Sequence, residues 1–234
     1  MKASTLLTVC ASALASAAPS GELEKRATVK GFDISHYQTS VDFNAAYSGG
    51  ARFVIIKATE GTTYKDPSFS SHYGGATSAG LIRGGYHFAR PDGGSGASQA
   101  NFFVANGGGW SGDGITLPGM LDIEYGPSST CYGLSTSAMV SWISDFVSTY
   151  HSKTSRYPLI YSTNDWWNTC TGNTKAFSSN SPLVLARYST AGPGTIPGGW
   201  PFQTIWQNSD SSPWGGDNDI FNGALSNLQK LATG

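Results

Sequence analysis

Two carboxylates placed two residues apart are the feature of this chain best suited to chemistry. Asp122 and Glu124 stand inside an apolar run, residues 120–125, that is typical of a buried strand. Side chains at positions i and i+2 of a strand point to the same face, so both acids should face one space. Burying acids is unfavourable unless a site uses them, and two carboxyl groups are the usual equipment for cleaving a glycosidic bond. The spacing therefore predicts a catalytic acid pair.

The elements that must position this pair alternate between short apolar runs and amphipathic stretches. We expect eight strands, at Val29–Ile34, Phe53–Lys57, Gly84–Phe88, Gly119–Glu124, Leu159–Tyr161, Leu183–Tyr188, Thr204–Gln207 and Ile220–Phe221. We expect helices at Asp42–Tyr47, Pro67–Ala79, Ser98–Asn106, Thr136–Thr149 and Thr163–Asn168. Helical signals fade after the fifth strand. Alternation indicates a parallel sheet with crossover helices, and eight largely apolar strands favour a closed α/β barrel.

Many polar residues fall where an expected strand ends. The set comprises Asp33, Glu60, His87, Asp122, Glu124, Tyr161, Tyr188, Trp206 and Gln207, with Asp219 beginning or preceding the last strand. In such barrels the C-terminal strand ends build the active site. Tyr and Trp rings are frequent near the same ends, at Tyr37, Tyr64, Tyr86, Tyr125, Trp166, Trp206 and Trp214. Because flat rings with a polar handle suit sugar faces, we expect a carbohydrate groove.

The first 26 residues are expected to be removed from the mature protein. A short basic start, an apolar stretch and the small residues Ala15-Ser16-Ala17 predict a secretory signal peptide over residues 1–18. Residues 19–26 end at Lys25-Arg26, a dibasic pair that often marks propeptide removal. We therefore expect a secreted, extracellular protein with a single catalytic domain over residues 27–234, which is long enough for one sizeable core.

Composition argues against several cofactors and partners. Cys10 lies in the expected signal peptide, so Cys131 and Cys170 predict one disulfide in a secreted chain. Two cysteines are too few for a structural zinc site and the histidine spacings fit no metal motif, so we expect no metal and no cofactor. A formal net charge of −1 gives no reason to expect nucleic acid or an anionic membrane as partner. We expect a monomer.

Several motifs together resemble one enzyme family. The segments GFDISHYQ (residues 31–38) and FVIIKATEG (residues 53–61), the second followed by Tyr64 and Asp66, are similar to the two opening signatures of glycoside hydrolase family 25, the Chalaropsis-type lysozymes. Later matches are GYHF (85–88), LDIE (121–124), IWQ (205–207) and DIF (219–221). The resemblance covers Val29 to Leu231. It implies a modified TIM-like barrel of five β/α units followed by three strands with little helix between them.

The resemblance also implies an activity, hydrolysis of the β-1,4 bond between N-acetylmuramic acid and N-acetylglucosamine in bacterial peptidoglycan. Glu124 would be the general acid, and Asp122 the neighbouring carboxylate that raises its pKa. Asp33 would join them by shaping the electrostatics of the pocket. Substrate contacts are expected from Asp219, Glu60, Tyr64, Tyr86, Tyr161, Tyr188 and Trp206. A structural role for Glu60, in a pair with Lys57 or Arg90, is equally open.

The spacing of the pair leaves three routes open. Cα atoms of residues i and i+2 on a strand lie about 6.6 Å apart, which does not select between the carboxyl separations of covalent and inverting glycosidases. In a third route the substrate's own 2-acetamido oxygen attacks the anomeric carbon while Asp122 orients that group. We favour this third route.

Two other functions compete with this one. A chitinase or related N-acetylglucosaminidase also uses an Asp-x-Glu strand, but chitinases usually extend it to Asp-x-x-Asp-x-Asp-x-Glu, and residues 117–121 hold no acid. A barrel that binds peptidoglycan or chitin without cleaving it could lose its acids freely. The joint presence of Asp33, Asp122, Glu124 and Asp219 favours catalysis over binding alone.

Overall fold

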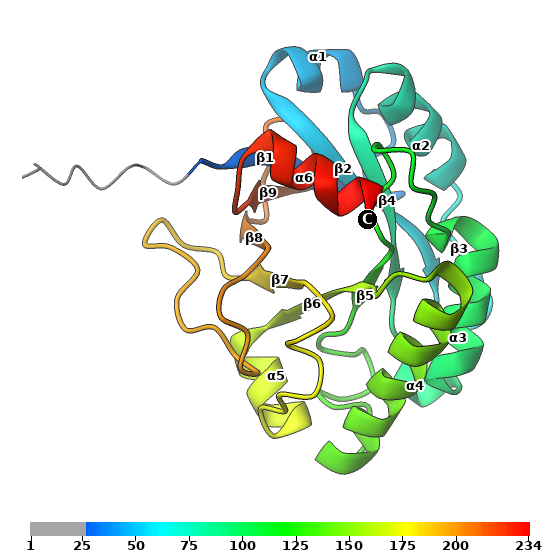
Figure 1. Ribbon diagram of the computed structural model, residues 1–234. Helices are drawn as coiled ribbons and strands as arrows, with labels where there is room; N and C mark the ends of the chain where they lie inside the picture. Colours follow the sequence, from blue (N-terminus) through cyan, green and yellow to red (C-terminus); the bar gives the residue numbers. More distant parts are fainter. Residues whose placement is uncertain (1–26) are drawn as a thin grey trace, which may run out of the picture.

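Eight strands close into a barrel in the computed structural model, which describes residues 27–234 (Figure 1). Around the barrel they are β1 (Val29–Ile34), β2 (Ala51–Glu60), β4 (Ile82–Phe88), β5 (Met120–Asp122), β6 (Leu159–Thr163), β7 (Leu183–Ala186), β8 (Ile205–Ser209) and β9 (Asp217–Phe221). Neighbouring strands are parallel, except that β9 runs antiparallel to both β8 and β1. The pairing of β1 with β2 closes the ring. The expected closed barrel is confirmed.

Helices cover the outside of the barrel along the first two thirds of the chain. They are α1 (Phe43–Ser48), α2 (Phe69–Ser78), α3 (Gly96–Phe103), the one-turn segments η1 (Pro91–Gly93) and η2 (Val104–Gly108), α4 (Thr136–Thr154) and α5 (Asn164–Thr171). The connections from β7 to β8 and from β8 to β9 contain no helix. This is the expected arrangement of five β/α units followed by helix-poor strands. The expected signal peptide and propeptide lie outside the described residues.

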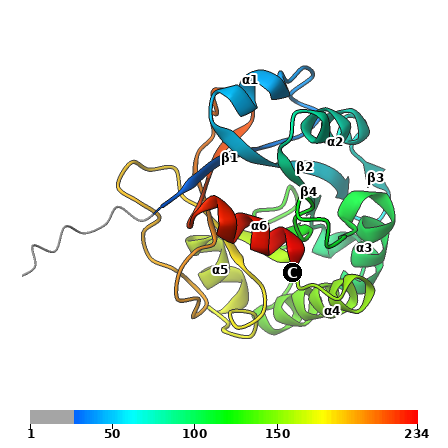
Figure 2. The same ribbon diagram turned by 45° about the horizontal axis from the view of Figure 1, so that its top comes forward.

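Besides the one-turn segment η1, two described elements were not expected from the sequence. The short strand β3 (Tyr64–Lys65) pairs antiparallel with the end of β2. The helix α6 (Leu225–Thr233) lies across one end of the barrel (Figures 1 and 2). Its Leu228 and Ala232 join the apolar cluster inside the barrel, which includes Phe53 and Ile205. This helix therefore closes the end of the barrel opposite the C-terminal strand ends.

Strand alternation sorts side chains between the barrel interior and the helix layer. On β2, Phe53 and Ile55 point inward, whereas Val54 and Ile56 pack against the helices α1 and α2. The same alternation on β5 sends Leu121 outward. The position of every inward-facing residue, including those of the site, follows from this period of two.

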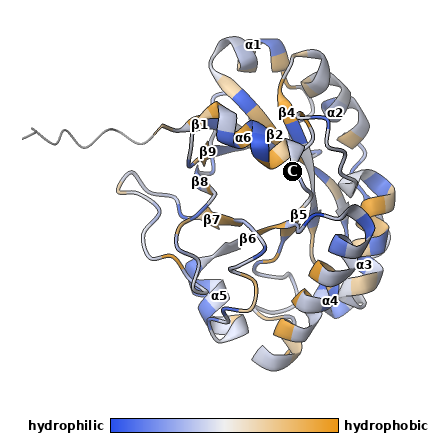
Figure 3. Ribbon diagram, viewed as in Figure 1, coloured by the Kyte–Doolittle hydropathy of each residue, from blue (hydrophilic) through white to orange (hydrophobic). Residues whose placement is uncertain are grey.

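The helix α4 shows why the outer layer packs as it does. Its N-cap Ser135 accepts a hydrogen bond from the backbone of Ala138, as expected for this residue type. Its buried residues recur at helical spacing and form one stripe: Met139, Trp142, Ile143, Phe146, Val147 and Tyr150. Figure 3 shows the resulting mixed colouring of hydrophobic and hydrophilic residues along this helix. The polar residues between them face solvent.

The expected disulfide joins Cys131 to Cys170, with a Cα–Cα distance of 5.3 Å. It links the loop that follows β5 to the helix α5. The bridge therefore ties the segment that follows β5 to the outer helix layer. No helix within residues 27–234 is long and apolar enough to cross a membrane.

Candidate active site

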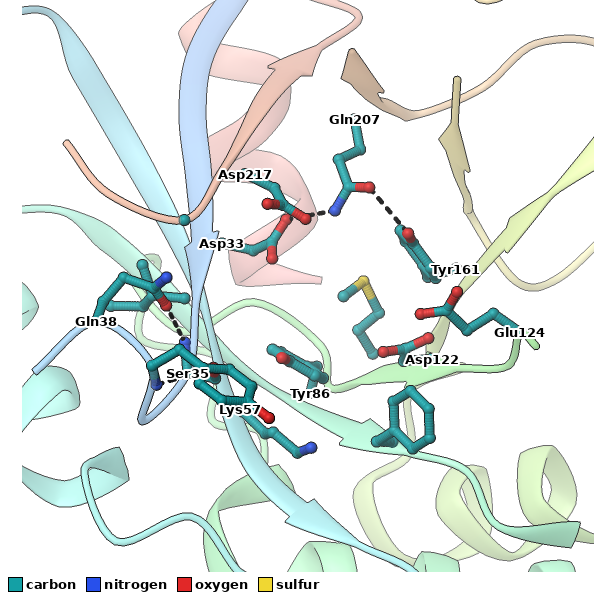
Figure 4. Close-up of a pocket in the computed structure, with 15 residues that line it drawn as sticks. Asp33, Ser35, Gln38, Lys57, Tyr86, Asp122, Glu124, Tyr161, Gln207 and Asp217 are labelled. Atoms are coloured by element: carbon teal, nitrogen blue, oxygen red, sulfur yellow. Dashed lines mark hydrogen bonds between the residues drawn. The ribbon is translucent and has the colours of Figure 1, made fainter. Parts of the chain in front are cut away.

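A pocket of about 250 Å³ opens at the C-terminal ends of the parallel strands (Figure 4). Its lining includes Asp33, Ser35, Tyr37, Gln38, Lys57, Tyr86, Phe88, Met120, Asp122, Glu124, Tyr161, Gln207 and Asp217. These residues come from β1, β2, β4, β5, β6, β8 and β9 and from the loops that follow the strands. Since β9 is antiparallel, its first residue reaches the same rim as the last residues of its neighbours. One pocket thus collects acids from distant parts of the chain.

Asp122 and Glu124 lie on one wall of this pocket, as their spacing predicts. The strand β5 ends at Asp122, so Glu124 stands two residues beyond the strand rather than within it. The backbone N–H of Ile123 still donates to the carbonyl oxygen of Tyr161 at 3.1 Å. The side chain of Ile123 is buried in the outer cluster. This contact keeps the segment extended and turns both acids inward.

Burial raises the pKa of both members of the pair. The pKa of Asp122 lies well above its ordinary value because the carboxyl is desolvated and because Glu124 is close. Desolvation and then repulsion from Asp217 raise the pKa of Glu124 to about 7. The charge of Lys57 opposes the rise in both groups. Two coupled acids with raised pKa values retain a proton between them near neutral pH.

The opposite wall of the pocket is organised by Gln207 (Figure 4). Its Nε2 donates to Oδ2 of Asp33 at 2.8 Å. Its Oε1 accepts hydrogen bonds from the hydroxyls of Tyr161 at 2.9 Å and Tyr188 at 3.2 Å. Gln207 is only 3% exposed. One buried amide therefore fixes an acid and two rings around the pocket.

Asp219 lies one inward-facing position deeper than Asp217 on β9, next to Asp33. It is 1% exposed, and its carboxyl oxygens meet no donor group of the described residues. Burial, together with the charge of Asp33, raises its pKa well above the ordinary value. Burial and the charge of Asp217 likewise raise the pKa of Asp33 to about 7. The neutral form of Asp219 is thus favoured.

Of the residues expected to contact substrate, Tyr86 and Tyr161 line the pocket, Tyr188 lines an adjoining opening and Asp219 is buried beneath the pocket. The other three line neither hollow. Glu60 accepts hydrogen bonds from Lys57 at 2.8 Å and Arg90 at 3.2 Å. Burial raises its pKa, but these two cations outweigh burial and lower it overall. The structure therefore favours the structural role that the sequence left open for Glu60.

Tyr64 and Trp206 are the other two. Tyr64 lies on β3, where its hydroxyl contacts Nδ1 of His36 at 3.1 Å. Trp206 alternates with the inward-facing Gln207 on β8, so its ring points out of the barrel and its Nε1 donates to the carbonyl oxygen of Arg187 at 2.9 Å. The place of Trp206 at a strand end predicted a substrate contact, but the period of two along β8 excludes it.

His87 does not line the pocket either. It is fully buried between the barrel and α3, where its ring nitrogens contact Thr59 at 2.8 Å and Gln99 at 2.9 Å. Burial lowers its pKa to about 4. His87 is therefore a neutral packing residue, and the pocket role considered for it is not supported.

Two charged residues of the pocket were not predicted from the sequence. Lys57 is buried and faces inward, two positions after Ile55, so the alternation on β2 could have found it. Asp217 lies at the start of β9, and its place at the rim depends on the antiparallel direction of that strand. No local signal in the sequence reveals that direction.

The geometry supports cleavage of a bond between sugars. One wall offers a coupled carboxyl pair that holds a proton, and the facing wall offers further carboxyls. Such an arrangement can protonate a leaving oxygen and stabilise positive charge on the sugar ring. Tyr86 and Tyr161 supply rings and hydroxyls that suit a sugar.

Comparisons with known proteins agree with this chemistry. The sequence profile of Glycosyl hydrolases family 25 matches residues 32–217. An N,O-diacetylmuramidase of Arthroderma benhamiae is 58% identical over 237 residues, which span all of both chains. An N,O-diacetylmuramidase of Chalaropsis sp is 62% identical over 211 residues, covering 88% of this chain and 100% of its own. A solved family GH25 lysozyme from Aspergillus fumigatus has a TM-score of 0.88 at 64% identity, covering 89% and 100% of the two chains.

Proposed function

The chain belongs to glycosyl hydrolases family 25, and we propose that it is a lysozyme that cleaves the β-1,4 bond between N-acetylmuramic acid and N-acetylglucosamine in bacterial peptidoglycan. The observation that carries this proposal is the acid pair Asp122 and Glu124 on one wall of a pocket at the active end of the barrel. Relatives named N,O-diacetylmuramidase support muramic acid as the sugar on one side of the cleaved bond.

Glu124 is the proposed general acid. With a pKa of about 7 it still holds its proton where an ordinary glutamic acid has lost it. It is partly exposed to the pocket, where it can pass that proton to the glycosidic oxygen while the bond from this oxygen to C1 breaks. A buried acid of raised pKa is the usual form of this catalyst.

Asp122 is proposed to orient the substrate's 2-acetamido group. Its Oδ1 has no hydrogen-bond partner among the described residues, which leaves it free to accept from the acetamido N–H. That bond favours the charged form of Asp122 and leaves the proton of the pair on Glu124. The acetamido oxygen then bonds to C1 as the leaving oxygen departs, and water opens the resulting ring with Glu124 as base. The configuration at C1 is retained.

The facing wall is proposed to stabilise the charge that develops on the sugar. Asp33 lies opposite the pair and, when ionised, favours an oxocarbenium-like transition state. Asp219 holds Asp33 from below, and Tyr86, Tyr161 and Tyr188 contact the sugar. Glu60, Tyr64 and Trp206 are not assigned to substrate, because their side chains are engaged elsewhere.

Secretion and processing form part of the proposal. Residues 1–18 would act as a signal peptide and residues 19–26 as a propeptide removed after Arg26. The intact mass of the protein recovered from culture medium tests this, because it should correspond to a chain beginning at Ala27. A mass that includes residues 19–26 would contradict processing at the dibasic pair.

Clearing of a bacterial cell-wall suspension tests the activity. The wild-type protein should lower the turbidity of the suspension, whereas Glu124→Gln should bind the walls and leave them intact. Chitin serves as the parallel substrate, since a chitinase would release reducing ends from it at a comparable rate. If both proteins bind walls and neither clears them, a binding module is the correct description instead.

A further inference from the structure

The catalytic pocket continues sideways into a second hollow. Glu124 and Tyr161 line the pocket and also an adjoining opening, whose other walls include Thr163, Arg187 and Tyr188. Thr163 and Arg187 in turn line a groove of about 400 Å³ between the start of α5 and residues 193–195 of the β7–β8 loop. We call this hollow the side groove. Shared lining residues connect the side groove, through this opening, to the pocket at Glu124.

The walls of the side groove are held by hydrogen bonds within the protein. Asn164 Nδ2 donates to the carbonyl oxygen of Thr195 at 3.0 Å, which ties the start of α5 to the loop. Arg187 Nη1 donates to the carbonyl oxygen of Gly192 at 2.7 Å. A Cβ on Gly194, whose φ is +73°, would lie 2.7 Å from that guanidinium. The loop is therefore shaped around Arg187, and the groove is formed before any ligand arrives.

Arg187 differs from the other cations near the site in its ion pairing. Lys57 and Arg90 are both paired with Glu60, and Arg90 also with Asp92. Arg187 is exposed and takes part in no ion pair with any residue of the range 27–234. The catalytic pocket beside it is lined by acids. A ligand that carries a carboxylate is thus repelled by the pocket and attracted to the side groove.

The lining of the side groove also argues against another sugar as its occupant. None of the residues that line it has an aromatic ring; Arg187 is its one cation and Asp165 its one anion. Sugar subsites usually offer a ring face for stacking. Backbone groups, one cation and one anion suit a peptide better. Oδ2 of the anion, Asp165, already accepts from the hydroxyl of Tyr125 at 2.9 Å.

We propose that the side groove binds the peptide stem of the muramic acid whose bond is cleaved, with Arg187 pairing to a carboxylate of that stem. The inference rests on the muramidase activity proposed above. In that reaction the C1 atom of muramic acid lies at Glu124, and the lactyl group on its C3 atom must lead the peptide out of the pocket. The opening that begins at Glu124 and Tyr161 leads into the side groove.

The test compares two substrates that differ in the stem and in the lactyl carboxylate that removal of the stem exposes. One is soluble peptidoglycan glycan with its peptides in place, and the other is the same glycan after an amidase has removed them. The variants are Arg187→Gln, Arg187→Lys, and Lys153→Gln as a matched charge removal on the exposed end of α4. Initial rates give kcat and KM for each pairing, at low and at high salt.

The expected result is specific to the stem. Arg187→Gln should lower kcat/KM about five- to tenfold on the glycan with stems, mainly through KM, and less than twofold on the stripped glycan. Arg187→Lys should recover part of the loss, and Lys153→Gln should behave as wild type. The preference of the wild-type enzyme for stems should weaken at high salt, whereas that of Arg187→Gln should not.

Other outcomes would overturn the proposal. Equal losses on both substrates would mean that Arg187 only supports the loop, and no loss on either would mean that the stem lies elsewhere. If wild type cleaves the stripped glycan but gains nothing from stems, the muramidase activity stands and the stem site fails. If wild type cleaves neither glycan, the proposed function fails and the stem site with it.

Discussion

Gln207 is the residue on which the geometry of the facing wall depends most. Its amide makes three hydrogen bonds, to Asp33, Tyr161 and Tyr188, from a position that is 3% exposed. Gln207→Met keeps nearly the same length and volume and removes all three bonds. No cavity is created, so the change isolates the polar contribution.

The size of the effect follows from which partners remain buried. Tyr188 is 54% exposed and can turn to water, so its lost bond contributes little. Tyr161 is 7% exposed and Asp33 faces the buried Asp219, so both lose a partner that water replaces poorly. At about 1–3 kcal/mol for each buried group left unpaired, the unfolding free energy should fall by about 3 kcal/mol, offset slightly by the more apolar side chain.

Thermal denaturation and kinetics measure the two consequences. The unfolding midpoint temperature should fall by about 9 °C, and kcat/KM should fall about tenfold or more because Asp33 and Tyr161 lose their fixed orientation. Gln229→Met, on the exposed side of α6, is the matched control and should change stability by less than about 0.5 kcal/mol. A Gln207→Met protein as stable and active as the control would refute the role given to this amide.

Three further changes test other parts of the structure. Lys57→Met removes the charge that lowers the pKa of Glu124, so the alkaline fall in activity near pH 7 should move to higher pH; an unmoved limb would contradict this coupling. Asp219→Asn removes a carboxyl whose pKa is raised in the folded protein. The native carboxyl therefore destabilises the fold as rising pH forces it to ionise. Urea unfolding should therefore show a shallower loss of stability from pH 5 to 8 in the variant, and parallel curves would count against it. Replacing Cys131 and Cys170 by Ala opens a link across 39 residues and should lower the unfolding free energy by about 4 kcal/mol, measured by thermal melts; a loss below about 1 kcal/mol would show that the bridge is not a main support.

Much of the barrel could be predicted because its strands are continuous apolar runs. The strand β1 was expected over Val29–Ile34 and lies there. The helix α6 was missed although Leu225, Leu228, Leu231 and Ala232 recur at helical spacing in the sequence. It has only nine residues and begins after Ala224, which gives no polar N-cap signal. Its contacts with the barrel interior through Leu228 and Ala232 stabilise it in the folded protein.

Some residues of the candidate site could likewise be predicted from local sequence, and others could not. The acid pair follows from the period of two, and the same rule would have excluded Trp206 and included Lys57. The position of Asp217 depends on the direction of a whole strand. The role of Gln207 depends on three partners, one on β1, one on β6 and one in the loop after β7. Such relations are set by tertiary structure and have no local signature.

Mass spectrometry of the muropeptides released from purified peptidoglycan tests the central claim most directly. After reduction of the new chain ends, the wild-type products should carry reduced N-acetylmuramic acid, and Glu124→Gln should release them at least about a hundredfold more slowly. Reduced N-acetylglucosamine at the new ends, or release by Glu124→Gln at the wild-type rate, would contradict a muramidase in which Glu124 donates the proton.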